Sequence, residues 1–465
     1  MRYAHTVAQV REAEGELMAR LPEGALMQRA ATGLAVALAG RLGRVYASRL
    51  VLLVGGGDNG ADAMWAGAML ARRGADVRAV LVGEPRPGAL AALRAAGGRV
   101  VEDLPREGLV VDGLVGIGGK GALRPAAAAL AERVRDREVV AVDLPSGVDA
   151  DTGEVAGAAV RADLTVTFGT LKPGLLLARP QVGELHLVDI GLALPPAPVE
   201  VLTDQDVDDL LPCPRPGDDK YTRGVVGVAA GSQTYTGAAV LSVGAAVRAG
   251  AGMVRFTGAP HAAEQVRARW PEVVVSEHDG AEVVDAGRVQ AWVVGPGLGT
   301  DDRAEATVRA VLEQDVPVLV DADGLTVLAR HPEWLLGRSA PTLLTPHDRE
   351  FARFGSQVTA DRLGSARRLA GALGVHVLLK GDATVVVGPG GPARVNATGT
   401  PVLATAGTGD VLSGAAGALL ARGLGPLDAG SAAAHLHGRA GERAAGAGTT
   451  SASEVLAHWP ARLAR

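Results

Sequence analysis

Short apolar runs alternate with helical stretches along the chain, and most of these runs end in a glycine-rich or acidic turn. In the first half, such runs occupy residues 50–54, 77–82, 109–112, 139–143, 164–168 and 185–189. Uninterrupted apolar strands separated by helices are typical of a parallel sheet that helices cover on both faces. Ligands of such sheets bind at the carboxyl ends of the strands. Functional side chains are therefore expected in the turns that follow the strands.

The same alternation starts again after residue 200. Its apolar runs occupy residues 225–230, 291–295, 316–321, 342–345, 375–380 and 385–387. A Pro-rich stretch, 192–200, separates the two series and is the predicted linker. With 465 residues the chain is long enough for more than one domain. We predict an α/β protein with one α/β domain at 1–200 and a different one at 201–465.

Composition excludes several classes of protein. A net charge of −5 and an aromatic content of 3% argue against nucleic-acid binding. No long uncharged apolar run is present, and Glu12, Glu14 and Glu16 interrupt the N-terminal region, so neither a membrane span nor a secretion signal is expected. The single cysteine, Cys213, makes no internal disulfide. We expect a soluble cytoplasmic protein, and helices rich in small residues lead us to expect a homo-oligomer.

The strongest signal is the segment from Asn396 to Gly414, in which a turn of small residues, Gly407-Thr408-Gly409, brings the carboxylate of Asp410 to the start of an apolar Gly/Ala-rich helix. Free backbone N–H groups at a helix start suit a phosphate. A carboxylate beside them suits the removal of a proton from a hydroxyl group. Together these features indicate phosphoryl transfer to an alcohol. The alternative is a Gly-rich turn in which Asp410 is an ordinary helix cap.

Three further motifs lie in the second half. Lys380-Gly-Asp-Ala-Thr384 ends a strand with a lysine, a glycine and a hydroxyl, which can contact the phosphates and ribose of a nucleotide. Gly295-Pro-Gly-Leu-Gly299 lets a ligand approach the backbone closely. His347 follows another strand. Taken singly, His347 has an alternative structural role, and Lys380 has the alternative role of neutralising Asp382.

In combination, these motifs resemble the ADP/ATP-dependent NAD(P)H-hydrate dehydratases, which have a ribokinase-like fold. The resemblance covers about residues 201–465 and rests on Gly231–Ala239, Gly295–Gly299, Leu344–His347, Lys380–Thr384 and Ala406–Asp410. It implies an adenine-nucleotide site at Lys380, Gly381, Asp382, Ala383, Thr384 and Gly409. It implies hydrate-substrate contacts at Ala238, Gly299, His347 and Asp410. One departure is Asp348-Arg349, where the family usually has Pro-Gly.

The implied chemistry agrees with the residues. Hydration of the reduced nicotinamide ring leaves a hydroxyl on C6, which is a poor leaving group. The resemblance implies that Asp410 assists phosphoryl transfer from ADP or ATP to this hydroxyl, and that loss of phosphate then restores NAD(P)H. Mg²⁺ is expected, because it neutralises charge in phosphoryl transfer. The alternative is a ribokinase-like small-molecule kinase, which would release a stable phosphorylated product.

In the first half, a Gly-rich turn over 55–62 follows a strand and opens a helix. It is a poor dinucleotide fingerprint, because its acidic residues would repel a pyrophosphate. A cation tolerates such a turn better. Oxygen ligands from Asn59, Asp112 and Ser146, all at strand ends, are suited to a monovalent cation. The alternative for each of these residues is a turn or a helix cap.

This half resembles the NAD(P)H-hydrate epimerases, which are Rossmann-like three-layer enzymes that interconvert the R and S hydrates. The resemblance rests on the acidic turn, on Asp112 with 116–121, and on Asp143-Leu-Pro-Ser-Gly-Val-Asp149. It implies potassium at Asn59, Asp112 and Ser146, and an acid/base role at C6 for Asp143. It implies substrate contacts from Asp58, Asn59, Gly60, Ala61, Asp62, Gly116, Ile117, Gly118, Gly119, Lys120, Gly121, Ala122 and Asp143.

Departures from the epimerase pattern leave a second hypothesis open. Asp58 replaces the usual Asn, Ala61 and Ala63 replace Gly, and 117–120 replaces Thr-Gly-Leu-Arg. The first half is therefore either an epimerase or a degenerate binding or assembly module. The order of the two halves matches that of the bifunctional repair enzymes. The expected partners are small molecules: hydrated NADH or NADPH and an adenine nucleotide.

Overall fold

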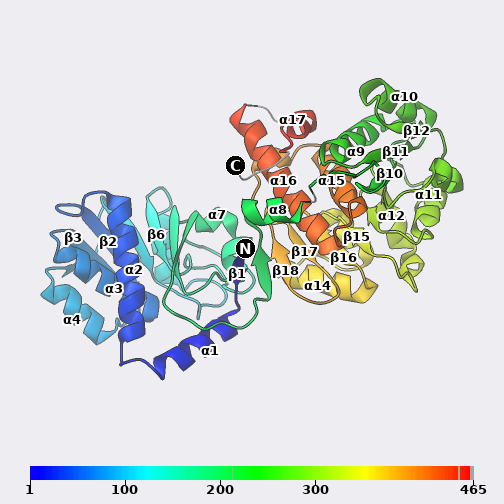
Figure 1. The fold of residues 1–465 in the computed structure, drawn as a ribbon. Coiled ribbons are helices and arrows are strands. Elements are labelled where there is room, and N and C mark those ends of the chain that lie inside the picture. The colour runs from blue at the N-terminus through cyan, green and yellow to red at the C-terminus, as the bar shows by residue number, and fades with distance from the viewer. Residues whose placement is uncertain (212, 449–450, 461–465) are drawn as a thin grey trace. The chain divides into compact units, whose positions relative to one another are not determined.

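The computed structural model describes residues 1–211, 213–448 and 451–460. The chain divides into two compact units (Figure 1). The first unit is Tyr3–Val199, and the second is Glu200–Arg465 together with Met1–Arg2. The division falls at the end of the stretch 192–200 predicted as a linker, which runs directly into a short strand.

A seven-stranded sheet forms the first unit, in the order β4-β3-β2-β5-β6-β7-β8, and every pair is parallel. From β2 the chain moves outward through β3 and β4, then returns to β5 on the other side of β2. The order reverses between β2 and β5, which is where ligands of open α/β sheets bind. The strands are β2 (Arg49–Gly55), β3 (Asp76–Val82), β4 (Arg99–Val100), β5 (Leu109–Gly113), β6 (Val139–Val142), β7 (Leu164–Phe168) and β8 (Glu184–Val188).

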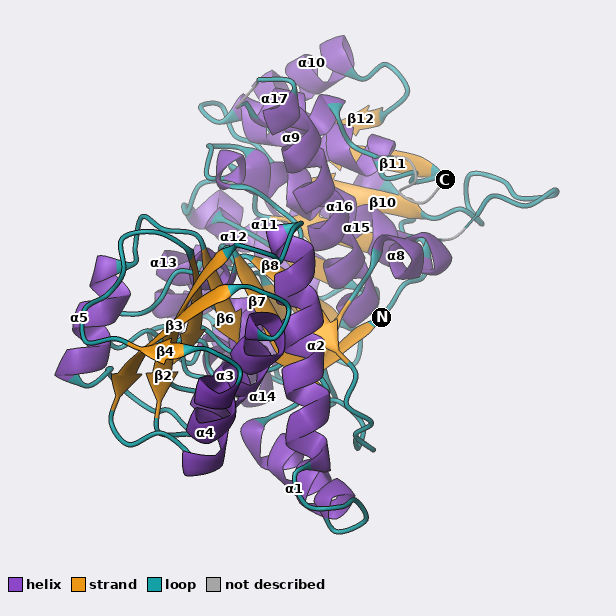
Figure 2. Ribbon diagram, turned by 90° about the vertical axis from the view of Figure 1, so that its left-hand side faces the viewer, coloured by secondary structure: helices purple, strands orange, loops and turns teal. Residues whose placement is uncertain are grey.

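Helices cover both faces of this sheet, because successive strand residues face opposite sides. Leu109 and Val111 of β5 pack with α2, α3 and α4, whereas Val110 packs with α5. Figure 2 shows strands flanked by helices. The predicted three-layer arrangement is present. The helices are α1 (Val7–Met18), α2 (Ala25–Leu42), α3 (Asp58–Ala71), α4 (Pro87–Ala95), α5 (Pro125–Arg133), α6 (Pro173–Leu177) and α7 (Arg179–Val182).

The second unit has an eleven-stranded sheet in the order β1-β9-β18-β17-β16-β15-β14-β13-β10-β11-β12. Neighbouring strands are parallel from β12 to β16. Strand β17 runs antiparallel to both of its neighbours, β16 and β18. The carboxyl ends of β10 and β13 to β16 therefore lie at one edge. The strands are β1 (Arg2–Ala4), β9 (Val199–Val201), β10 (Val225–Ala229), β11 (Met253–Thr257), β12 (Val274–Ser276), β13 (Ala291–Val294), β14 (Val318–Val320), β15 (Thr342–Leu344), β16 (His376–Leu379), β17 (Val385–Val387) and β18 (Ala393–Val395).

Helices also flank this second sheet: α11 contacts β13, and α14 contacts β16. The α-helices are α8 (Asp204–Leu210), α9 (Thr236–Arg248), α10 (Pro260–Arg269), α11 (Asp302–Leu312), α12 (Asp323–Arg330), α13 (Asp348–Phe351), α14 (Arg362–Leu373), α15 (Thr408–Ala421), α16 (Pro426–Gly446) and α17 (Ala452–Ala457). Short 3-10 helices are η1 (Gly280–Ala286), η2 (Pro332–Leu335), η3 (Ala352–Phe354) and η4 (Pro401–Leu403). In the described part of the chain, none of the helices combines the length and the apolar character that crossing a membrane requires.

The core of the second unit explains its helices of small residues. Helices α9, α15 and α16 pack together on one face of the sheet. Gly414 of α15 lies against the backbone of Ser242, and Gly417 lies against the side chain of Val293. The small residues thus let helices approach inside this unit. The homo-oligomer inferred from such residues stays a prediction.

Candidate active sites

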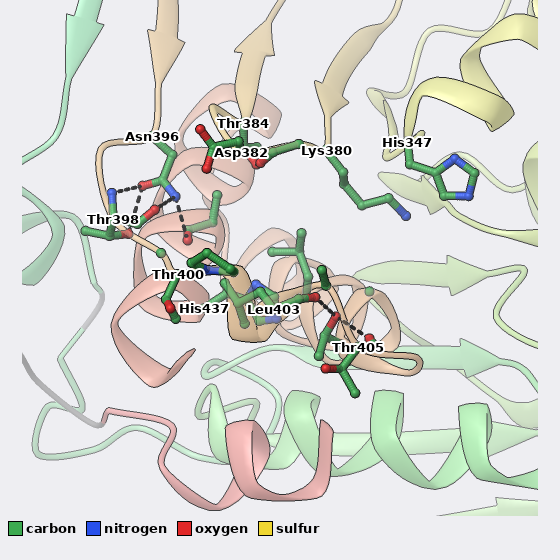
Figure 3. Close-up of a pocket in the computed structure, with 18 of the residues that line it drawn as sticks. His347, Lys380, Asp382, Thr384, Asn396, Thr398, Thr400, Leu403, Thr405 and His437 are labelled. Atoms are coloured by element: carbon green, nitrogen blue, oxygen red, sulfur yellow. Dashed lines mark hydrogen bonds between the residues drawn. The ribbon is translucent and has the colours of Figure 1, made fainter. Parts of the chain in front are cut away.

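Side chains from several strand ends converge at one edge of the second sheet. Asp321 follows β14, His347 follows β15 and Lys380 follows β16. Helix α15 begins at Thr408, after Gly407 in the left-handed conformation with φ 89°. Figure 3 shows Lys380 and His347 beside the turn that leads into α15. The sequence predicted this convergence, because parallel strands end at the same edge.

Lys380 forms a buried ion-pair network that the sequence did not predict. Its Nζ lies 2.7 Å from Oδ1 of Asp321 and 3.5 Å from Oε2 of Glu350. Oδ2 of Asp321 accepts a hydrogen bond of 2.5 Å from the Ser413 hydroxyl. Burial alone would lower the pKa of Lys380, but the carboxylates of Asp321 and Glu350 outweigh it, and the pKa is raised. Lys380 is therefore a cation tied to Asp321 at the floor of the site.

Asp410 has a perturbed acidity. Burial raises its pKa to about 7, and the charge of Asp321 adds to the effect, while Lys380 opposes it. Asp323 and Glu350 raise the pKa further. A base with a pKa near the working pH is the most effective in proton transfer. The environment of Asp410 thus suits general-base catalysis.

A pocket of about 630 Å³ lies beside this network. Its wall includes the predicted nucleotide residues Lys380, Gly381, Asp382, Thr384 and Gly409, together with His347. Two predicted residues do not line the pocket. Ala383 is buried, although both of its neighbours in sequence line the wall, and Asp410 directly follows the lining residue Gly409. The remaining lining residues are Asn396, Thr398, Gly399, Thr400, Pro401, Leu403, Ala404, Thr405, Gly407, Thr408, Leu412, Ala434 and His437.

The loop from Asn396 to Thr405 forms much of this wall. The sequence singled it out as part of the segment 396–414 but gave its side chains no individual role. Oδ1 of Asn396 accepts hydrogen bonds from the backbone N–H of Thr398, at 3.3 Å, and from its hydroxyl, at 3.0 Å. The Asn396 amide donates to the carbonyls of Thr398 and Ala434, each at 3.1 Å (Figure 3). Asn396 therefore fixes the loop against α16. Burial lowers the pKa of His437, at the pocket floor, to about 4, so its ring is neutral.

His347 has both a structural and a pocket-lining position. Its Nδ1 accepts hydrogen bonds from the backbone N–H groups of Arg349, at 3.1 Å, and Glu350, at 3.2 Å. The ring thus caps α13 and still lines the pocket. The departure at 348–349 fits this short helix, in which Asp348 forms an ion pair of 2.7 Å with Arg362.

A second pocket in this unit has a volume of about 320 Å³. Gly299 lines it and donates its backbone N–H to Oδ2 of Asp323, at 2.9 Å. Ala238 lies against Gly297. Ala322 within the acidic turn 321–323 has φ 50°, a strained value for a residue other than glycine and one that is concentrated at functional sites. The acidic turn is therefore linked to one lining residue of each pocket, because Asp321 pairs with Lys380 and Asp323 accepts from Gly299.

In the first unit, two of the three predicted cation ligands, Asp112 and Ser146, are in contact at the switch point. Oδ2 of Asp112 accepts from the backbone N–H of Ser146 at 2.8 Å, and Oδ1 accepts from its hydroxyl at 2.7 Å. The Asn59 amide donates to the Val142 carbonyl, and its oxygen lies against Gly116. Burial raises the pKa of Asp112 to about 6. Within 1–211, 213–448 and 451–460, no cluster of three or more His, Cys, Asp or Glu residues is arranged to hold a metal.

Asp143 pairs with a lysine that the sequence left without a role. Lys172 is 1% exposed, and its Nζ lies 2.5 Å from Oδ1 of Asp143. The same oxygen accepts from the Thr167 hydroxyl at 3.0 Å and the Phe168 backbone N–H at 3.2 Å. The available sequence signal was rarity, since only four of the 46 basic residues are lysines. Asp143 has φ 64°, which again indicates a functional position.

The predicted substrate residues of the first unit fall into two groups. A pocket of about 700 Å³ is lined by Gly118, Gly119, Lys120, Gly121 and Ala122. The other group lies outside the wall of this pocket and consists of Asp58, Asn59, Gly60, Ala61, Asp62, Gly116, Ile117 and Asp143. The charge of Asp143 acts on Asp62 and on Glu14 of α1. The loop 116–122 contains residues of both groups, and its Gly118 lies against Arg11 of α1.

Two parallel α/β units, each with buried carboxyl groups at the ends of its strands, define a two-domain α/β enzyme. The family model described as NAD(P)H-hydrate dehydratase matches residues 226–458. The model described as the YjeF-related protein N-terminus matches residues 23–174. A ribokinase-like superfamily protein from Enterococcus faecalis shares the fold of the second unit, with a TM-score of 0.51, 24% identity, and coverage of 58% of this chain and 96% of that one.

Full-length relatives have the same two parts. A bifunctional NAD(P)H-hydrate repair enzyme of Mycobacterium leprae is 52% identical and covers 100% of both chains. Its namesake in Mycobacterium tuberculosis is 54% identical and covers 91% of this chain and 90% of the relative. The ADP/ATP-dependent NAD(P)H-hydrate dehydratase of Bacillus subtilis, co-crystallised with ATP and Mg²⁺, is 29% identical, with a TM-score of 0.51 and coverage of 56% of this chain and 95% of that one. The chain belongs to the family of bifunctional NAD(P)H-hydrate repair enzymes.

These findings confirm the predicted family, the fold class and the enzyme class. The second unit is ribokinase-like and the first is Rossmann-like. The chain is a repair enzyme with an epimerase part and a dehydratase part. The roles of individual residues stay predictions.

Proposed function

We propose that the second unit dehydrates the S hydrates of NADH and NADPH, with Asp410 as the general base. The observation that supports this role is the position of Asp410 beside the Lys380–Asp321 pair, with a pKa of about 7. The pocket of about 630 Å³ takes the adenine nucleotide, through Lys380, Gly381, Asp382, Ala383, Thr384 and Gly409. The hydrate binds on the side of Ala238, Gly299 and His347.

In this mechanism, Asp410 removes the proton of the C6 hydroxyl while the hydroxyl oxygen attacks the terminal phosphoryl group of the nucleotide. Backbone N–H groups at the start of α15 and the ammonium of Lys380 stabilise the phosphate charge. The C6–O bond then breaks with the lone pair of the ring nitrogen, phosphate leaves, and loss of a proton from C5 restores NAD(P)H. Asp382 is the carboxylate in the pocket wall and fits a nucleotide-bound Mg²⁺, which supplies charge neutralisation.

ADP is the proposed donor, with ATP as the alternative. The test incubates S-hydrated NADH with Mg²⁺ and either ADP, ATP or no nucleotide, and follows the return of reduced-nicotinamide absorbance. The proposal expects recovery only with a nucleotide, and faster recovery with ADP. Release of a stable phosphorylated product without NADH would overturn it in favour of the kinase.

We propose that the first unit interconverts the R and S hydrates, with Asp143 as an acid/base group. Asp112 and Ser146, which are in contact, offer carboxylate and hydroxyl oxygens, and Asn59 offers an amide oxygen beside Gly116; these are hard donors of the kind that suits potassium. The bound cation would supply positive charge beside the site. Substrate contacts are assigned to the residues of 58–62 and 116–122.

Epimer exchange measured without nucleotide tests this part. The exchange of purified R hydrate is followed by chromatography, in potassium and then in a large organic cation. The proposal expects exchange well above the buffer rate, and faster exchange in potassium. If the protein exchanges epimers no faster than buffer in either salt, the first unit is a binding or assembly module.

A further inference from the structure

We propose that the first unit epimerises its substrate with two buried carboxyl groups, Asp62 as proton donor and Asp143 as proton acceptor, and that Lys172 is the positioning residue of Asp143. The inference rests on the proposed epimerase function. The sequence predicted neither a role for Lys172 nor separate roles for Asp62 and Asp143 as proton donor and proton acceptor.

The Lys172–Asp143 pair has the geometry of a fixed carboxylate. All three hydrogens of a lysine ammonium can donate. The three acceptors of Lys172 are Oδ1 of Asp143 at 2.5 Å, the Thr167 hydroxyl at 3.0 Å and the Phe168 carbonyl at 3.1 Å. The described hydrogen bonds of Asp143 all end on Oδ1. Its other oxygen, Oδ2, is therefore available to a water molecule or a substrate.

Asp62 has the opposite environment. It lies in α3, is 7% exposed, and its Oδ1 has no hydrogen-bond partner among the described residues. An ionised carboxylate without a partner is costly to bury. Burial therefore raises the pKa of Asp62 well above its usual value, and the charges of Asp143, Asp58 and Glu14 raise it further. Asp62 therefore keeps its proton to a higher pH than an ordinary carboxyl group, which suits a proton donor.

The other charges near Asp62 and Asp143 do not remove the difference between an unpartnered carboxyl group and one that is paired with a lysine. Asp58 forms an ion pair of 2.6 Å with Arg86. Glu14, on α1, is itself partly buried, which raises its pKa, while Lys172 lowers it. Lys172 is the only cation in direct contact with Asp143 among the described residues. A buried carboxyl group without a partner and a carboxylate paired with a lysine can serve as the acid and the base of one reaction.

The reaction balances without an oxidant or a reductant. Asp62 gives its proton to the C6 hydroxyl, the C6–O bond breaks, and water leaves as the lone pair of N1 forms an N1=C6 double bond. A second water attacks the opposite face of C6, and its proton passes to Asp143 while the N1=C6 electron pair returns to N1. The exchanged protonation states then support the reverse reaction, and proton exchange with solvent resets the pair.

The test is the pH profile of nucleotide-free epimer exchange, with the buffer rate subtracted. In the wild type, exchange should decline at alkaline pH as Asp62 loses its proton. Asp62→Asn should slow exchange by about 10²–10⁴-fold and remove the alkaline decline. Lys172→Met should slow exchange and leave the alkaline decline in place, because Asp143 loses the ammonium that holds its Oδ1. Lys172→Arg keeps the charge and the donors and should restore part of the rate.

Controls separate this role from a structural one. Glu132→Gln, an exposed change on α5, should leave the rate and the alkaline decline unchanged. Circular dichroism and thermal unfolding of each variant show whether the first unit is folded, and if Lys172→Met does not fold, Asp62→Asn and Lys172→Arg decide. An unmoved alkaline decline in Asp62→Asn, or exchange at the wild-type rate in Lys172→Met, would overturn the inference. A wild type without exchange would instead overturn the epimerase assignment itself.

Discussion

Asp410 shares a small volume with Asp321, Asp323 and Glu350, and one ammonium, that of Lys380, opposes their charge. This excess of negative charge, together with burial, holds the pKa of Asp410 near neutrality. A residue at an ordinary helix start would have no such surroundings. The position therefore favours the catalytic interpretation of Asp410 over the helix-cap interpretation.

The pH dependence of dehydration follows from this arrangement. A base must be ionised, so the rate should rise as the pH rises through about 7 and then level off. Asp410→Asn should lower kcat by about 10²–10⁴-fold or more, because it keeps the shape and removes the base. Initial rates with the S hydrate at saturating nucleotide measure both effects. Asp410→Asn turnover close to that of the wild type would reduce the residue to a cap.

Lys380→Ala tests the opposing charge. Lys380 lowers the pKa of Asp410, so its loss should move the rise in rate to higher pH. It should also raise the KM of the nucleotide, because the ammonium that faces the phosphates is gone. Lys120→Ala, in the first unit, is the matched control and should change neither quantity. An unmoved pH profile in Lys380→Ala would contradict the electrostatic argument.

At the scale of elements, the sequence predicted most strands and helices, because uninterrupted apolar runs alternate clearly with helical stretches. It missed β1, β4, β9, β11, β12 and β18, and of these only β11 is longer than three residues. It placed residues 58–62 in a Gly-rich turn, although helix α3 starts at Asp58. The site was predictable where a motif is local, as in 406–410. The site was not predictable where two partners are far apart in the sequence and meet only in the folded chain. Lys172 lies 29 residues from Asp143, and Asp321 lies 59 residues from Lys380.

Packing of α15 against α9 gives a prediction at this scale. A Cβ on Gly414 would overlap the Ser242 carbonyl, which is backbone and cannot turn away. Gly414→Ala should therefore lower the free energy of unfolding by about 1–3 kcal/mol. Gly371→Ala, in α14, is the control, because a Cβ there meets nothing within 4 Å. It should stabilise the protein by up to about 1 kcal/mol. Thermal or urea unfolding measures both, and equal effects would contradict the packing argument.

At the scale of the whole molecule, the division into two compact units separates the two reactions. The proposed residues of epimerisation all lie in Tyr3–Val199, and those of dehydration all lie in Glu200–Arg465. A mixture of R and S hydrates needs both reactions for full recovery, since dehydration uses only the S form. The two parts of one chain therefore act in sequence on one pool of damaged cofactor.

Asp143→Ala makes this division measurable. With mixed hydrates, ADP and Mg²⁺, the variant should restore NADH rapidly until the S form is consumed, and then only as fast as R converts without catalysis. The wild type should continue to completion at the rapid rate. Asp410→Asn should show the reverse, exchange of epimers without recovery of NADH. Absorbance follows the recovery and chromatography identifies the hydrate that remains. Slowed dehydration of pure S hydrate by Asp143→Ala would mean that the two units do not work independently.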